Sequence, residues 1–455
     1  MTSQVTLNNK QFYKQVVTLA IPIAVQSLIA SSLSLVDNLM VGSLGEAELA
    51  AVGAGIQLFM IHYMFLFGFC SGSATFVAQF FGVGDIRSIK KTIGFTVMTG
   101  VGIGACFFAA GIMIPEKIMG VYSTDAEVIA MGAEYIRTGA PTFLMMGFTI
   151  PFYIALRATQ QTQLPLYISV TAFVTNTFMN YVLIFGNLGA PRLETQGAAM
   201  ATVLARSLEL IMLVIVVFVR KNMVGGRPSE YIGLSRNLIG RMVKNNIPTT
   251  ANETFWGLGQ SMYMAAIGHI SVTAYAATQA CHTIENVFVM AGFSLGDAAL
   301  IIIGEKLGQN EIQLSRMMAN KFLKLTAVTG IILGAMLLVF SRPLLGFFDF
   351  TQEGFDSAAR ILVVYSAAIP FKMVVGLMIV GILRSGGDTT FAAVCELSAI
   401  WVIAVPLTFL GAVVWHLPVY IVVMLSLSAE AVEILVLLWR TGTGKWANNV
   451  VSDIE

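Results

Sequence analysis

The feature that most constrains this chain is a succession of apolar runs, each long enough to cross a lipid bilayer, which takes about 20 apolar residues of α-helix. Only 11% of the 455 residues are charged, against about 25% in soluble domains. The sequence therefore predicts an all-α integral membrane protein with twelve transmembrane helices. The predicted spans are 16–42, 50–80, 92–114, 136–156, 164–186, 196–219, 247–269, 274–304, 322–341, 360–382, 390–412 and 418–439.

The second half of the chain repeats the first. With a shift of 226 residues Pro22 aligns with Pro248. Further along, "LRATQQT" at 156–162 aligns with "LRSGGDT" at 383–389. Six spans, an even number, separate the two copies, so both copies enter the membrane in the same direction. The sequence thus predicts two parallel-repeat six-helix bundles, related by an axis along the membrane normal, which is an arrangement typical of transporters.

The domain prediction is an N-lobe at 1–219, a polar linker at 220–246 and a C-lobe at 247–455. Most of the 26 Lys and Arg residues fall in the connections on one side, which includes the linker and both chain ends. The opposite side holds Lys117, Arg137, Arg192, Arg342 and Arg360. Because basic loops stay in the cytoplasm, we expect both termini to be cytoplasmic and the protein to lie in the inner (cytoplasmic) membrane.

Ionisable side chains inside the predicted spans are mostly acidic. The acids are Asp37, Glu209, Glu253, Glu285, Asp297, Glu396, Glu430 and Glu433, and the bases are Arg206 and Lys372. A charge at that depth costs about 2.5–3.5 kcal/mol on insertion scales. So many acids cannot all pair with two bases, so some must be protonated, bind a cation or face water. This excess predicts coupling to a cation.

Asp37 is the only charged residue in 15–45. We expect it to carry a proton or Na⁺ in the N-lobe, the alternative being a structural acceptor for neighbouring hydroxyl and amide groups. Its candidate partners are Asn176 and Asn180, which lie four apart and therefore on one helix face. Their carbonyl oxygens suit Na⁺ and their NH₂ groups suit a carboxylate, although interhelical hydrogen bonding alone would also explain them. Thr202 would add a hydroxyl.

In the second half, Glu253, Trp256 and Gln260 lie on one face of a predicted helix. An acid, an indole and an amide on one stripe can line a site for an organic cation through charge and cation–π attraction, or simply pack against other helices. Lys372, in the middle of a span, is the expected counter-ion for Glu253 or Glu285. That pair is either a tether that substrate displaces or a static ion pair.

Other classes of protein lack support in the sequence. No GxxxxGK[ST] loop is present, so we expect no ATP. The four His residues have no metal-binding spacing, and we expect no cofactor apart from the coupling ion. A net charge of +1 gives no sign of nucleic-acid binding.

Several segments together resemble a known family. "LAIPIAVQSLIASSLSLVDNLMVGSLGEAELAAVG" is similar to the first span of MATE (multidrug and toxic compound extrusion) transporters. "LRSGGDTT" resembles their RGxGDT loop, and "IPTTANE" resembles the start of their seventh span. "NTFMNYVLIFG" and "GAAMAT" resemble spans five and six. The resemblance covers nearly the whole chain in order.

The resemblance implies a bacterial-type, V-shaped antiporter of two lobes that exports organic cations in exchange for H⁺ or Na⁺ by alternating access. It places Asp37, Asn176, Asn180 and Thr202 in an N-lobe cation site, with Na⁺ held by the first three, and Glu253 in the C-lobe. The chain departs from the family at two places. Proton-coupled archaeal relatives have Asp where Asn180 stands, and NorM-like members have Asp in span ten, near Lys372 of this chain.

The main expectation is therefore a secondary active multidrug exporter that is not an enzyme and acts as a monomer in the bilayer. One alternative is a flippase for lipid-linked saccharides of the same superfamily, which would need a basic cavity for phosphate groups. A second alternative is a non-transporting membrane sensor or scaffold, and a third is a membrane enzyme. The sensor or scaffold does not explain the buried acids or the repeat, and no nucleophile–base spacing supports an enzyme.

Overall fold

The computed structural model describes residues 9–346, 348 and 350–452, and this part of the chain forms helices joined by short connections without a β-strand. Its contacts divide the chain into two compact units. Val25–Gly240 form one, called here the N unit. The residues up to Ala24 and those from Arg241 onward form the other, called the C unit. The boundary after Gly240 lies inside the predicted linker, whereas the first part of the first helix groups with the second half of the chain.

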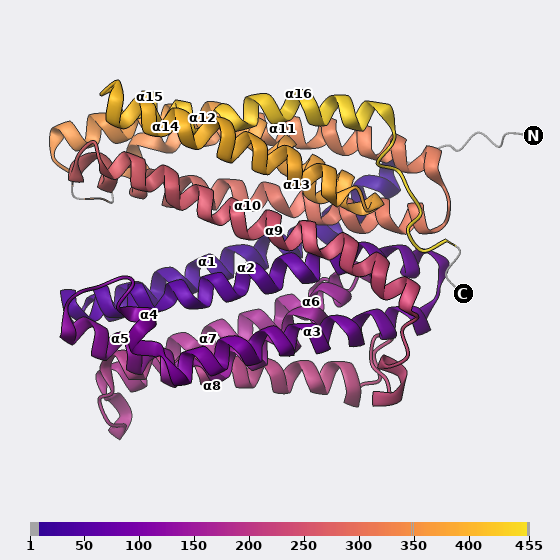
Figure 1. Ribbon diagram of the computed structural model, residues 1–455, viewed down its shortest axis with the longest axis horizontal. Coiled ribbons are helices and arrows are strands. Elements are labelled where there is room, and N and C mark those ends of the chain that lie inside the picture. The colour runs from indigo at the N-terminus through magenta and orange to yellow at the C-terminus, as the bar shows by residue number, and fades with distance from the viewer. Residues whose placement is uncertain (1–8, 347, 349, 453–455) are drawn as a thin grey trace, which may run out of the picture. The chain divides into compact units, whose positions relative to one another are not determined.

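The N unit consists of helices that run side by side in Figure 1. Its α-helices are α1 (Asn9–Gly42, from Val25 onward), α2 (Glu46–Val83), α3 (Ile86–Met113), α4 (Pro115–Met119), α5 (Ala126–Gly139), α6 (Pro141–Ala158), α7 (Gln163–Phe185) and α8 (Glu194–Val214). A π-helical turn at Ile215–Val219 continues α8, and 3₁₀ turns lie at Asn187–Gly189 and Pro228–Tyr231.

The C unit has the same order of long helices but more interruptions (Figure 1). Its α-helices are α9 (Arg236–Gly268, from Arg241 onward), α10 (Val272–Gly308), α11 (Ile312–Leu345), α12 (Gln352–Gly376), α13 (Thr389–Ser398), α14 (Val405–Phe409), α15 (Val419–Ser426) and α16 (Ser428–Thr443). π-Helical turns occupy Leu377–Leu383, Ala399–Ala404 and Leu410–Val414, and a 3₁₀ turn spans Arg384–Gly386.

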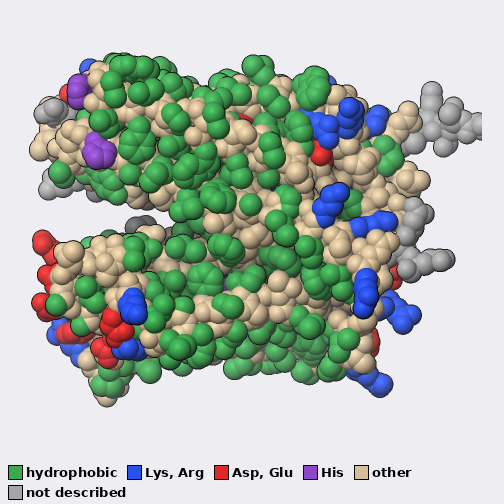
Figure 2. Space-filling model, in the orientation of Figure 1, with side chains coloured by type: hydrophobic (Ala, Val, Ile, Leu, Met, Phe, Trp, Pro, Cys, Tyr) green, Lys and Arg blue, Asp and Glu red, His purple; other side chains and the backbone are tan. Residues whose placement is uncertain are grey.

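Eleven helical segments in the described part of the chain are long and apolar enough to cross a membrane. They overlap eleven of the twelve predicted spans. The remaining span, 247–269, lies in α9, which misses this criterion because polar and charged residues fill its first half. Figure 2 shows hydrophobic side chains over most of the helix flanks on the face in view, with Lys and Arg gathered toward helix ends.

Glycines bring the third and fourth long helices of each unit into close contact. In the N unit, a Cβ on Gly100 of α3 would come within 2.6 Å of the carbonyl oxygen of Gly147 on α6. In the C unit, a Cβ on Gly330 of α11 would come within 2.7 Å of Pro370 on α12. Small residues allow this backbone approach, which membrane helices use because lipid supplies no hydrophobic drive for their association. The repeat seen in the sequence is thus also a repeat of packing.

The connection after α8 is attached to the N unit. Glu230 accepts a hydrogen bond from Lys90 Nζ at 2.6 Å and another from the Arg227 N–H at 3.1 Å. The Lys90 ammonium, followed by the Arg227 N–H, lowers the pKa of Glu230 below its ordinary value of 4.5. Gly94 of α3 has no side chain because a Cβ there would overlap the Tyr231 carbonyl. The first part of the predicted linker is therefore a packed segment.

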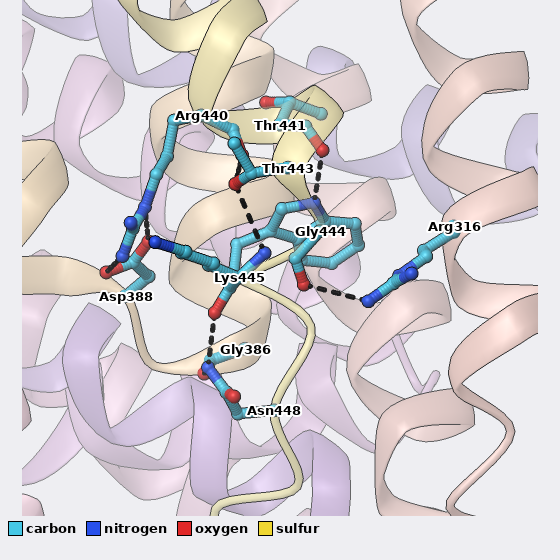
Figure 3. Close-up of polar contacts among 10 residues, drawn as sticks. Arg316, Gly386, Asp388, Arg440, Thr441, Thr443, Gly444, Lys445 and Asn448 are labelled. Atoms are coloured by element: carbon cyan, nitrogen blue, oxygen red, sulfur yellow. Dashed lines mark hydrogen bonds and ion pairs between the residues drawn. The ribbon is translucent and has the colours of Figure 1, made fainter.

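The loop between α12 and α13 is held by the C-terminal end of the chain (Figure 3). Arg440 of α16 donates to both carboxylate oxygens of Asp388, at 2.7 and 3.1 Å. Asn448 donates to the Gly386 carbonyl at 3.5 Å. A Cβ on Gly386 would overlap the carbonyl of Trp446, whose own side chain is only 1% exposed. These contacts fix the backbone just after Arg384, a residue that forms an ion pair with Glu253 in the C unit.

Candidate functional site

The four predicted residues of the N-lobe site lie in one hydrogen-bonded chain within the N unit. Asn180 of α7 donates through Nδ2 to Asp37 Oδ1 of α1. The same nitrogen donates to Asn176 Oδ1 at 3.0 Å, and Asn176 Nδ2 donates to Thr202 Oγ1 of α8 at 3.3 Å. Thr202 in turn donates to the Ala198 carbonyl at 3.0 Å. The structure therefore brings the four residues together, while their role in ion binding stays a prediction.

One acceptor in this chain has no hydrogen-bond donor. Asn180 is fully buried and Asn176 is 1% exposed. Both hydrogens of the Asn180 amide are used, but its Oδ1 has no hydrogen-bond partner among the described residues. A buried carbonyl oxygen without a donor is costly, and it is a natural ligand for a cation or for a protonated group. The carboxylate of Asp37 and this oxygen form the part of the N unit best suited to hold a small cation.

A cation of the protein itself lies near Asp37. Arg206 of α8 donates to Glu209 at 2.6 Å, as expected for two residues three apart on one helix. Glu209 is 2% exposed, and the charge of Arg206 also acts on Asp37. Among the described residues, the ion-pair partner of Arg206 is thus Glu209, and the hydrogen-bond partner of Asp37 is Asn180.

In the C unit, Lys372 of α12 pairs with Glu285 of α10 at 2.8 Å. The sequence left Glu253 and Glu285 as alternative partners, and this contact selects Glu285. Glu253 of α9 instead pairs with Arg384 at 3.0 Å. Both pairs include one side chain that is about 2% exposed. Each pair thus joins one desolvated charge to a partly exposed partner, and the desolvated member depends strongly on that partner.

The sequence interpretation missed Arg384, which it placed in the loop at 383–389. In the structure, the π-helical turn Leu377–Leu383 prolongs α12 and carries Arg384 into the packed interior, where it is 1% exposed. The signal that was available is the repeat, because Arg384 aligns with Arg157 in "LRATQQT". A basic residue preserved between two copies of a unit was better evidence of a buried partner than its position in a loop.

Trp256 and Gln260 lie on α9 with Glu253, as expected. The indole packs against an apolar cluster of the C unit that includes Tyr263 and Ile400. Glu253 reaches Arg384, so the acid of the predicted stripe has a protein cation as its partner in this structure. The roles of these three residues in substrate binding stay predictions.

Two units of membrane-length helices, each with desolvated ionisable groups in its interior, define a polytopic helical membrane transporter. The chain belongs to the MatE family of multidrug efflux transporters, whose family model matches residues 22–182 and again 251–410. The double match confirms the internal repeat. Members of this family are transporters rather than enzymes, and they act on small molecules in a membrane.

Relatives and solved structures agree with this assignment. The chain is 25% identical over 394 residues to the probable multidrug resistance protein YoeA of Bacillus subtilis, covering 86% of this chain and 84% of that protein. It is 26% identical to the probable multidrug resistance protein NorM of Bradyrhizobium diazoefficiens, covering 89% of each. A mutant of the Vibrio cholerae MATE transporter VcmN has a TM-score of 0.88 at 18% identity, covering 97% of this chain and 98% of that one. The predicted twelve-helix, two-lobe fold class is confirmed.

Proposed function

We propose that this protein is a secondary antiporter that exports organic cations by alternating access, driven by inward movement of H⁺ or Na⁺. The observation that carries the proposal is the chain from Asp37 through Asn180 and Asn176 to Thr202. It joins three helices around one carboxylate and one buried amide oxygen without a donor. The names of the curated relatives, which are multidrug resistance proteins, support the substrate class.

In this mechanism, a cation that enters the N unit binds between Asp37 Oδ1 and Asn180 Oδ1. Binding neutralises the carboxylate and changes which groups the Asn180 amide can donate to, so α1 and α7 adopt a different packing. One monovalent charge moving down about 100 mV supplies about 2.3 kcal/mol, enough for a conformational change of a few kcal/mol. The predicted lobes, 1–219 and 247–455, are the parts that rearrange.

The substrate class follows from the same charge pattern. Acids outnumber bases among the buried ionisable groups of the C unit, and Glu253 shares a helix face with Trp256 and Gln260. An organic cation gains from the carboxylate and from the indole ring. In the proposed mechanism it competes with Arg384 for Glu253 and so weakens a desolvated ion pair while it is bound.

The proposed setting is the cytoplasmic membrane, with both chain ends in the cytoplasm and the protein acting as a monomer without a cofactor. The predicted topology puts the chain ends on the side that carries most of the Lys and Arg residues, which favours this orientation. The residues before Asn9 and after Ser452 lie outside the described part of the chain.

The test is ethidium efflux from proteoliposomes with Na⁺ and pH gradients imposed separately. Native protein and Asp37→Asn are compared, with Asn38→Ala as the matched control, because Asn38 is the next residue of α1 and is exposed. We expect efflux driven by one of the two gradients, lost in Asp37→Asn and kept in Asn38→Ala. Efflux that persists in Asp37→Asn, or no efflux of folded native protein under either gradient, would overturn the proposal.

A further inference from the structure

An amide side chain occupies the same place in both units and makes the same pair of contacts. Gln26 of α1 and Asn252 of α9 are related by the shift of 226. In the N unit, Arg157 donates to the Gln26 carbonyl, and Gln26 Nε2 donates to Ser169 at 3.0 Å. In the C unit, Arg384 donates to the Asn252 carbonyl at 3.4 Å, and Asn252 Nδ2 donates to Glu396 at 2.5 Å.

The two copies differ in charge. Ser169 of the N unit aligns with Glu396, and Ser27 aligns with Glu253. In the N unit, the amide of Gln26 therefore links Arg157 to the hydroxyl of Ser169. In the C unit, the amide of Asn252 donates to one carboxylate, Glu396, and Arg384 donates to another, Glu253. Arg384 bonds Glu253 and Asn252 at once, so the amide links Glu396 to the Glu253–Arg384 ion pair.

Two further carboxylates adjoin Glu396. Glu433 of α16 is 3% exposed, and the charges of Glu396 and Glu430 act on it. Glu433 Oε1 and Glu430 Oε2 are buried without a hydrogen-bond partner in the described part of the chain. A buried carboxylate oxygen without a donor is costly, so these two oxygens favour a group that supplies a hydrogen or a positive charge.

The nearby cations are already paired. Arg384 pairs with Glu253 and Lys372 pairs with Glu285, while Glu396, Glu430 and Glu433 form no ion pair among the described residues. The charged and titratable groups that interact electrostatically with one or more of these three acids are Glu253, Arg384, Lys372, Glu285, Tyr263, Tyr365 and Cys395. Only two of them are cations, so the net charge of the whole neighbourhood is negative unless protons are bound.

These unpartnered oxygens suit protons better than a metal ion. No three His, Cys, Asp or Glu side chains in the described residues converge in a way that could hold a metal. The carboxylates are near enough for their charges to interact but are not arranged as a chelating set. Interacting, desolvated carboxylates bind protons as a group rather than singly.

The backbone beside Glu396 is also specialised. The π-helical turn Ala399–Ala404 begins three residues after Glu396, and the turn Leu377–Leu383 directly precedes Arg384. The matching helices of the N unit, α6 and α7, are α-helical throughout. π-Helical insertions inside helices are frequent at functional sites because they re-aim side chains.

We propose that Glu396 and Glu433, with Glu430 beside them, form a proton-binding site of the C unit that is separate from Asp37, and that Asn252 and Arg384 transmit its charge state to Glu253. When the site is protonated, Asn252 loses its charged acceptor and Arg384 is held more by Glu253. When the site is deprotonated, the negative charge of Glu396 strengthens the hydrogen bond that Asn252 Nδ2 donates to it. The existence of the site stands on the C unit alone, and only its use in transport rests on the proposed function.

The test is infrared difference spectroscopy of the purified full chain, recorded between acidic and alkaline pH, in which a protonated carboxyl group has its own C=O stretch. The variants are Glu433→Gln and Glu396→Gln, which keep side-chain shape, with Ser169→Ala as the matched control in the N-unit copy. Asp37→Asn serves as the background that removes the N-unit carboxylate. Size-exclusion chromatography checks the fold of each protein.

We expect a protonated-carboxyl signal that titrates in native protein, persists in Asp37→Asn and Ser169→Ala, and is lost or shifted in both Glu→Gln variants. A signal that disappears in Asp37→Asn, or that neither Glu→Gln substitution changes, would overturn the proposal. Because this readout needs no transport, failure of antiport in the efflux test and failure of the C-unit site are distinguished.

Discussion

The N unit and the C unit share one amide–arginine contact but surround it with different chemistry. Gln26 and Arg157 are joined to a serine, whereas Asn252 and Arg384 are joined to glutamates. The comparison teaches that the repeat preserves the position of the arginine and its amide acceptor. The residue that the amide donates to differs, since it is the hydroxyl of Ser169 in the N unit and the carboxylate of Glu396 in the C unit.

At the position of Asp37, the N unit has a carboxylate and the C unit does not. With the shift of 226, Asp37 aligns with Tyr263, which lies in an apolar cluster with Ala429. Ala429 in turn aligns with Thr202 when the shift is 227. The carboxylate and hydroxyl of the N-unit site are thus replaced by an aromatic ring and a methyl group. The C unit is nevertheless charged close by, because Glu430 directly follows Ala429 and its charge acts on Tyr263.

The largest expected effect comes from the arginine pair. Arg384→Ala removes a buried cation from a group of carboxylates that includes Glu253 and Glu396, and we expect a loss of about 3–5 kcal/mol in the free energy of unfolding. In Arg157→Ala, loss of the contact with the neutral amide of Gln26 contributes about 1–2 kcal/mol. Denaturant unfolding in detergent measures both values.

Glu253→Gln in the Arg384→Ala background is the control, because it removes the unpaired charge and should recover part of the loss. No recovery of stability by Glu253→Gln in the Arg384→Ala background would contradict the claim that charge at Glu253 makes Arg384 necessary.

The second effect concerns Lys372 and Glu285, an ion pair that has no counterpart in the N unit, where Met145 and Phe59 align with them. We expect Lys372→Met or Glu285→Gln alone to cost about 3 kcal/mol because one charge is left buried. The double variant should cost less than the sum, with a coupling energy of about 2 kcal/mol. Additive losses in the same unfolding assay would show that the pair contributes no coupling.

The smallest effect lies outside the membrane helices, at the connection held by Lys90 and Glu230. Because folding lowers the pKa of Glu230, its contribution is full above its ordinary value of 4.5 and is lost as pH falls through the lower folded value. We expect Glu230→Gln to increase cleavage of the connection by trypsin slightly at neutral pH. A difference from native protein in hydrogen exchange that does not shrink as the pH falls below 4.5 would contradict this origin.

Much of the fold was predictable because apolar run length alone defines a membrane helix. The predicted span boundaries were wrong where one helix ends and the next begins inside a single apolar run. Span 136–156 is divided in the structure between α5 (Ala126–Gly139) and α6 (Pro141–Ala158), with a proline at the start of α6. The π-helical turns of the C unit carry no composition signal, so the extension of α12 to Arg384 could not be read from hydropathy.

The candidate site was partly predictable for a similar reason. Asn176 and Asn180 share a helix face by spacing alone, and a lone acid in a neighbouring span limits their partners. The contact from Asn252 to Glu396 joins residues 144 apart, and its register depends on how α9 packs against α13. The sequence identified the acids inside the spans but did not predict which residues contact them. For Arg384, the signal in the sequence was its alignment with Arg157 in the repeat.

The most direct test of two separate ionic centres counts the protons released when ethidium binds to the protein in detergent without Na⁺. Titration calorimetry in buffers of different protonation enthalpy gives this number for native protein, Asp37→Asn, Glu433→Gln and the double variant. We predict that Asp37→Asn keeps a proton release that Glu433→Gln diminishes and the double variant loses. Complete loss of release in Asp37→Asn alone, or native release in Glu433→Gln, would contradict the account.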